Sequence, residues 1–155
     1  MKVAVITGAT SGIGWEAALQ IDRRFVSLDE IWIIGRREEK LLELRKLLKH
    51  SVRTFAMDVT DEDDMKAFED VLYKINPNIK MLFQSAGMGL HGKFAEMTAK
   101  DQTAMIRLNC EALTHFTSMC LPFMKKNSNI INLASSAGMM PFPGYSVYGA
   151  SKSYV

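Results

Sequence analysis

The loop TGATSGIG at residues 7–14 constrains the fold more than any other part of the sequence. It follows an apolar run at 3–6, and it leads into a segment where Ile13, Ala17 and Ile21 recur at helical spacing. A strand, a glycine turn and a helix in this order aim the unpaired N–H groups of the helix at whatever lies above the strand. We therefore expect a phosphate-bearing ligand here, in preference to an ordinary glycine-rich turn.

Composition favours one globular domain without a membrane or nucleic-acid partner. The chain has 155 residues, of which 48% are apolar and 23% charged, and its dispersed charges sum to +2. No transmembrane span or signal core is visible, so a cytoplasmic protein is expected. Cys110 and Cys120 lie ten residues apart in one helical segment, and the three histidines lack ligand spacing, so neither a disulfide nor a metal site is expected.

Apolar runs of strand length alternate with helical patterns along the whole chain. Strands are predicted at 3–6, 31–34, 52–56, 81–83 and 130–134. Helices are predicted over 12–24, around Leu41, Leu44 and Leu48, around Met65, Phe68, Leu72 and Ile75, and over 101–124. This alternation predicts an α/β fold with a Rossmann-like, doubly wound parallel sheet, which binds ligands beyond the carboxyl ends of its strands.

The segment after the second strand bears on the choice of dinucleotide. A fold that prefers NAD usually places an acidic side chain here, whereas an arginine accommodates a 2′-phosphate. In this chain Gly35 is followed by Arg36 and Arg37, and guanidinium groups bind phosphate bidentately, so NADP(H) is predicted. NAD(H) remains the alternative, because Glu38 or Glu39 is close enough in sequence to reach the ribose.

Three polar residues in the second half of the chain are candidates for chemistry. Asn109 falls within the apolar stripe of the fourth predicted helix, where an unpaired amide would be costly. Tyr148 and Lys152 are four residues apart, which places them on one face of a helix that begins near Tyr148. A nearby ammonium favours the phenolate form that a tyrosine needs as a general acid or base, although this spacing also occurs in purely structural helices.

Taken together, the motifs resemble those of the short-chain dehydrogenase/reductase family over essentially the whole chain. They are TGATSGIG at 7–14, Asp58-Val59, Ala86-Gly87, Asn109, Ser135 and YGASK at 148–152. The resemblance implies hydride transfer between a nicotinamide cofactor and a small carbonyl or alcohol substrate, with reduction as the favoured direction. It also implies a homo-oligomer for the full-length protein.

The resemblance assigns a role to each candidate. Tyr148 would be the general acid or base, Lys152 would favour its phenolate and hold the ribose, Ser135 would bind the reacting oxygen in preference to Ser136, and Asn109 would hold a relay water. The expected cofactor-binding residues are Gly8, Ser11, Gly12, Ile13, Gly14, Arg36, Arg37, Asp58, Val59, Ala86, Gly87, Tyr148 and Lys152.

Two departures from the family pattern affect these expectations. Gln84-Ser85 replaces the two asparagines that usually precede Ala-Gly. The chain also stops three residues after Lys152, before the family's last strands and helices. We therefore expect residues 1–155 to form a single dinucleotide-binding domain that is the N-terminal part of a longer chain. A non-catalytic NADP(H)-binding sensor or scaffold, and a fragment unable to fold alone, are the alternatives.

Overall fold

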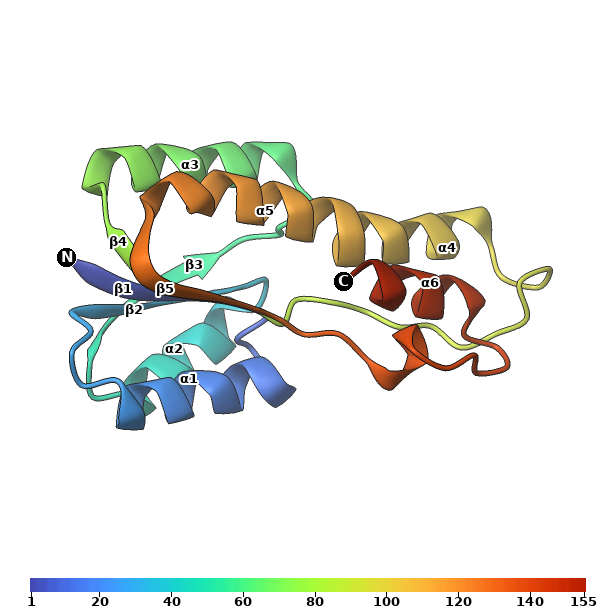
Figure 1. The fold of residues 1–155 in the computed structure, drawn as a ribbon, viewed down its shortest axis with the longest axis horizontal. Coiled ribbons are helices and arrows are strands. Elements are labelled where there is room, and N and C mark those ends of the chain that lie inside the picture. Colours follow the sequence, from blue (N-terminus) through green and yellow to red (C-terminus); the bar gives the residue numbers. More distant parts are fainter.

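The computed structural model describes all 155 residues, and its centre is a sheet of five parallel strands in the order β3-β2-β1-β4-β5 (Figure 1). The strands are β1 (Lys2–Thr7), β2 (Glu30–Gly35), β3 (Ser51–Ala56), β4 (Asn78–Gln84) and β5 (Met124–Asn132). The helices are α1 (Gly12–Arg24), α2 (Glu38–Leu47), α3 (Glu62–Ile75), α4 (Ala99–Ile106), α5 (Leu113–Cys120) and α6 (Ser146–Tyr154). The predicted Rossmann-like α/β class is confirmed.

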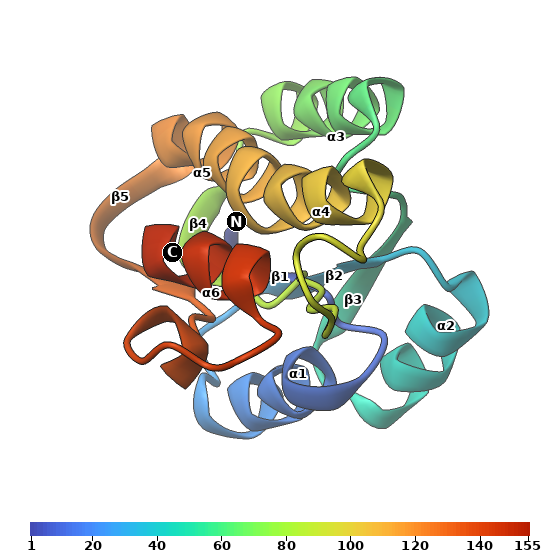
Figure 2. The same cartoon turned by 90° about the vertical axis from the view of Figure 1, so that its right-hand side faces the viewer.

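Helices cover both faces of the sheet, as Figure 2 shows when the molecule is viewed toward the carboxyl ends of the strands. In β1, Val3 and Val5 pack into the core cluster beneath α3 and α5. Ala4 and Ile6 point the other way, into the cluster formed with α1 and α2. All four side chains are fully buried, which explains why the predicted strands are continuous apolar runs without polar alternation.

The strand register brings three loops to one edge of the sheet. Thr7, the last residue of β1, lies beside Ile34 of β2 and Gln84 of β4. The strand order reverses between β2 and β4 on either side of β1, and such a switch point leaves a crevice above the sheet. The glycine loop, the Arg36-Arg37 segment and the loop after β4 therefore all begin around this crevice.

The fourth predicted helix exists, but it is not one regular α-helix. A π-helical segment, Arg107–Ala112, separates α4 from α5, and a 3-10 turn, Leu121–Phe123, follows α5. The run starts at Ala99 instead of residue 101, and Pro122 lies in its last turn, as a helix-ending proline should. π-Helical turns are rare and frequently mark functional sites, and this one contains Asn109.

The polar pair Gln84-Ser85 ties neighbouring elements together. Gln84 is buried and its amide donates to Thr117 Oγ1 at 2.7 Å and to Asn132 Oδ1 at 3.0 Å. Ser85 Oγ donates to the Thr7 carbonyl at 2.7 Å. The pair Gln84-Ser85 thus links the end of β4 to β1, β5 and α5.

Other boundaries differ by a few residues from those expected. Strand β5 begins at Met124 and ends at Asn132, so Leu133 and Ala134 lie beyond it. Leu48 follows the last residue of α2 but is still buried. None of the helices has the length and apolar character that crossing a bilayer requires.

Candidate cofactor and active site

A cavity of about 520 Å³ opens at the carboxyl edge of the sheet, between the glycine loop and the π-helical segment. Its lining comes from six parts of the chain that are far apart in sequence. The lining residues are Gly8, Thr10, Ser11, Ile13, Gly14, Ile34, Gly35, Arg36, Arg37, Met57, Asp58, Val59, Thr60, Ser85, Ala86, Gly87, Met88, Ala104, Arg107, Leu108 and Leu133.

The glycine loop forms one wall of this cavity. Gly8 has φ of +69°, and a Cβ there would lie 2.6 Å from the Ala86 backbone nitrogen, so only glycine fits the turn. Helix α1 begins at Gly12 without a side-chain cap from Ser11. Its first N–H groups are thus left for a ligand, and the exposed apolar side chain of Ile13 lies at the cavity wall.

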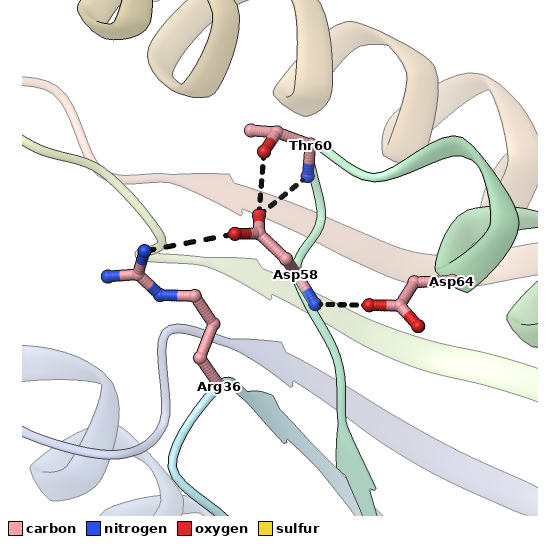
Figure 3. A network of polar contacts seen from close by, with 4 residues as sticks. All are labelled: Arg36, Asp58, Thr60 and Asp64. Atoms are coloured by element: carbon pink, nitrogen blue, oxygen red, sulfur yellow. Dashed lines mark hydrogen bonds and ion pairs between the residues drawn. The ribbon is translucent and has the colours of Figure 1, made fainter.

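Two arginines from the loop after β2 form the adjoining wall. Arg37 donates from Nη2 to the carbonyl oxygen and to Oγ1 of Thr10, both at 3.1 Å, so it braces the glycine loop. Arg36 is exposed, and its Nη1 lies 3.8 Å from Asp58 Oδ2 (Figure 3). Only one carboxylate, that of Asp58, lines the cavity with these arginines and Arg107, so the cavity attracts anions.

Asp58 is held in place by its own chain neighbourhood. Its Oδ1 accepts from the Thr60 backbone nitrogen at 2.9 Å and from Thr60 Oγ1 at 2.7 Å, while its backbone nitrogen donates to Asp64 Oδ2 at 2.8 Å (Figure 3). Burial opposes ionisation, but the Thr60 hydrogen bonds and the charges of Arg36 and Arg107 outweigh it and hold the pKa of Asp58 below its ordinary value. Asp58 is therefore anionic at neutral pH.

Asn109 joins three segments behind the cavity. Its Oδ1 accepts from the Met88 backbone nitrogen at 2.9 Å, and its Nδ2 donates to the Met88 carbonyl at 2.8 Å and to Ser151 Oγ at 2.9 Å. Ser151 Oγ donates in turn to the Tyr148 carbonyl at 2.7 Å. The amide, only 1% exposed, clamps the loop after β4 to α6. Both amide hydrogens are used, and the role of Asn109 in holding a relay water stays a prediction.

Tyr148 and Lys152 share one face of α6, as the spacing predicts. The Lys152 Nζ lies 6.0 Å from the centre of the Tyr148 ring and donates to the Leu133 carbonyl at 2.7 Å. Burial lowers the pKa of Lys152, while the nearby Cys110 opposes this shift. The Tyr148 ring lies against the backbone of Gly89, which leaves no room for a Cβ there.

Gly87 lies between the cavity and the side chains of Asn109 and Lys152. It lines the cavity, and a Cβ built on it would lie 3.2 Å from Asn109 Oδ1 and 3.4 Å from Lys152 Nζ. The amide and the ammonium thus lie directly behind the cavity wall at this glycine.

Ser135 lies at the start of the 3-10 turn Ser136–Gly138, where its Oγ accepts from the Ala137 backbone nitrogen at 3.2 Å. This turn packs against α6, and the Ser153 hydroxyl donates to the Gly138 carbonyl at 2.6 Å. Ser135 therefore lies in the segment that packs against the helix carrying Tyr148, but the two side chains make no hydrogen bond with each other.

Most of the predicted cofactor residues meet in one place. Gly8, Ser11, Ile13, Gly14, Arg36, Arg37, Asp58, Val59, Ala86 and Gly87 line the cavity, whereas Gly12, Tyr148 and Lys152 do not. The lining residues Thr10 and Arg107 and the buried clamp residue Ser151 were not among the predicted site residues. For Ser151, the available clue in the sequence was its position inside the YGASK motif.

Comparisons with known proteins agree with this architecture. A family model described as short chain dehydrogenase matches residues 2–155. The chain is 39% identical over 162 residues to sulfoacetaldehyde reductase 2 of Chromohalobacter salexigens, covering 99% of this chain and 62% of that protein. It is 34% identical over 160 residues to the NADP-dependent 3-hydroxy acid dehydrogenase YdfG of Escherichia coli, again covering 99% of this chain and 62% of that protein.

A solved structure, that of an actinorhodin polyketide ketoreductase with NADPH, is similar over 99% of this chain and 60% of its own length. The TM-score is 0.82 and the sequence identity 26%. The chain thus spans 60–62% of the length of these three proteins.

Proposed function

Because this chain belongs to the short-chain dehydrogenase/reductase family, we propose that it serves an NADP(H)-dependent oxidoreductase that reduces a small-molecule carbonyl to an alcohol. The observation that carries the proposal is Gly87, which lines an arginine-rich cavity and adjoins Asn109 and Lys152 on its other side. The two NADP-associated proteins among those compared support the choice of cofactor.

The residues of the cavity fit a dinucleotide phosphate. The uncapped start of α1 offers N–H groups to a pyrophosphate, and Arg36 and Arg37 offer guanidinium groups to a 2′-phosphate. Val59 and Leu108 supply apolar surface of the kind that an adenine ring requires. When bound, the cofactor supplies the hydride.

The catalytic step that falls to the protein is the transfer of a proton. Tyr148 donates its phenolic proton to the substrate oxygen as the carbonyl carbon accepts the hydride, which yields the alcohol and a tyrosinate. The Lys152 ammonium favours that tyrosinate through its charge. Ser135 donates to the same substrate oxygen, and Asn109 keeps α6 in register with the loop after β4. Solvent returns the proton to Tyr148.

We further propose a cytoplasmic protein that acts as a homo-oligomer, without a nucleic-acid or membrane partner. The low net charge of +2 and its dispersal along the chain support the absence of a polyanionic partner.

Substitution Tyr148→Phe in the full-length protein tests the proposed chemistry. We expect NADPH binding, followed by isothermal titration calorimetry, to stay close to wild type, while turnover of a panel of aldehydes and ketones falls by at least about 10³-fold. Tyr73→Phe is the matched control, because Tyr73 is exposed on α3 far from the cavity. Undiminished turnover in Tyr148→Phe would refute the role of the phenol.

A further inference from the structure

Arg107 is the one arginine of the cavity that no protein group holds. Arg37 donates to Thr10, and Arg36 faces Asp58 at 3.8 Å. Arg107 also lines the cavity, but its guanidinium takes part in no hydrogen bond or ion pair of the structure. A free guanidinium of this kind is available as a counter-ion for a ligand or for a neighbouring carboxylate.

Asp58 carries the one carboxylate that lines the cavity with Arg107, whereas the carboxylates of Asp61, Glu62, Glu69 and Glu111 line the adjoining groove. A groove of about 260 Å³ between α3 and α5 adjoins the cavity, and the two share Val59, Thr60 and Arg107 in their walls. Arg107 thus lies across from the segment that immediately follows Asp58. Both residues line the same cavity, and the charge of Arg107 is one of the influences that lower the pKa of Asp58.

Arg36 has two possible anionic partners once a 2′-phosphate enters the cavity. Its side chain is 76% exposed, and a separation of 3.8 Å makes the pair with Asp58 a loose one, so little free energy is lost when Arg36 turns away. The Asp58 carboxylate cannot move with Arg36, because Thr60 holds its Oδ1 with two hydrogen bonds. If nothing replaced Arg36, the carboxylate would repel the incoming phosphate.

We propose that Arg107 is a specificity-determining residue that neutralises Asp58 when Arg36 turns away from it to bind the 2′-phosphate of NADP(H). This inference rests on the proposed NADP(H) dependence. NADH carries no 2′-phosphate, so Arg36 stays with Asp58 in that complex and Arg107 is not needed. Arg107 therefore affects the preference between the two nucleotides and acts through Asp58 instead of touching the phosphate.

A double-mutant cycle on the full-length protein tests this proposal, with dissociation constants for NADPH and NADH from calorimetry as the readout. In wild type, Arg107→Gln should lower the ratio of NADPH to NADH affinity about fivefold, the size expected for two charges several ångströms apart near the surface. In an Asp58→Asn background, the same substitution should change the ratio by less than about twofold. Asp58→Asn keeps an oxygen that accepts from Thr60.

Three further measurements complete the test. Arg107→Lys keeps the charge and should keep the preference, and Arg45→Gln, an exposed arginine in the last turn of α2, should leave both affinities unchanged. An unchanged ratio in Arg107→Gln would overturn the proposal. So would an equal fall in both backgrounds, because Arg107 would then contact the phosphate directly. A wild type that does not prefer NADPH would instead refute the proposed NADP(H) dependence, and this inference with it.

Discussion

Substitution of Asn109 by alanine should destabilise the protein, because the amide is the clamp between the loop after β4 and α6. Three hydrogen bonds are lost, two with the Met88 backbone and one with Ser151 Oγ. At a net contribution of about 1 kcal/mol for each bond, the loss sums to roughly 3 kcal/mol. Alanine is the better helix former by about 0.6 kcal/mol, so the free energy of unfolding should fall by roughly 2–3 kcal/mol.

Urea denaturation of the full-length protein, followed by far-UV circular dichroism, measures this loss directly. The matched control is Glu111→Gln, two residues along the same π-helical segment but exposed, which should stay within about 0.5 kcal/mol of wild type. A similarly small change in Asn109→Ala would show that the three hydrogen bonds carry no net stability and that the clamp argument is wrong.

Four other substitutions test the supports of the site by the same denaturation assay. Gly14→Ala would place a Cβ against the Gly8 carbonyl and Ser85 Oγ and should cost roughly 2–3 kcal/mol, whereas Gly12→Ala meets open space and should cost only about 1 kcal/mol from its positive φ. Asp22→Asn removes a carboxylate whose pKa is lowered, because burial opposes its ionisation but hydrogen bonds from His50 and Lys49 outweigh that effect. The resulting loss of unfolding free energy relative to wild type should be full at pH 7 and should shrink as the pH falls below about 4. Lys152→Met removes an ammonium whose pKa is lowered by burial. Between this lowered pKa and about pH 10.4 the unfolded wild type binds more protons than the folded protein, so wild-type stability should rise as the pH approaches that upper value from below, and this rise should be smaller in the variant.

The fold was predictable because the sheet is covered on both faces. Strands such as β1 and β2 are apolar at every central position, and amphipathic helices separate them, so the alternation of patterns is strong. The π-helical turn was not predictable from periodicity. Met105, Asn109, Leu113 and Phe116 recur at the spacing of an ordinary α-helix, so nothing in the pattern indicates the π-helical segment.

The candidate site was predictable where backbone geometry dictates the residue type. Gly8 must be glycine because of its positive φ and its contact with Ala86, so its position carries information. Arg107 reaches the cavity only because distant segments fold against each other, and nothing in its local sequence indicates this. Arg37 shows a second limit: it lines the cavity as expected, but it also braces the glycine loop through Thr10.

The position of β4 explains why binding and chemistry should be coupled in this protein. The strands on one side of the switch point carry the glycine loop and the arginines, whereas β5 on the other side leads to Ser135 and α6. The loop after β4 touches both groups, since Ser85 is bonded to β1 and Gly89 lies against the Tyr148 ring. A change in this loop must therefore displace the cavity wall and the Tyr148 helix together, so its substitutions should alter cofactor affinity and turnover in parallel.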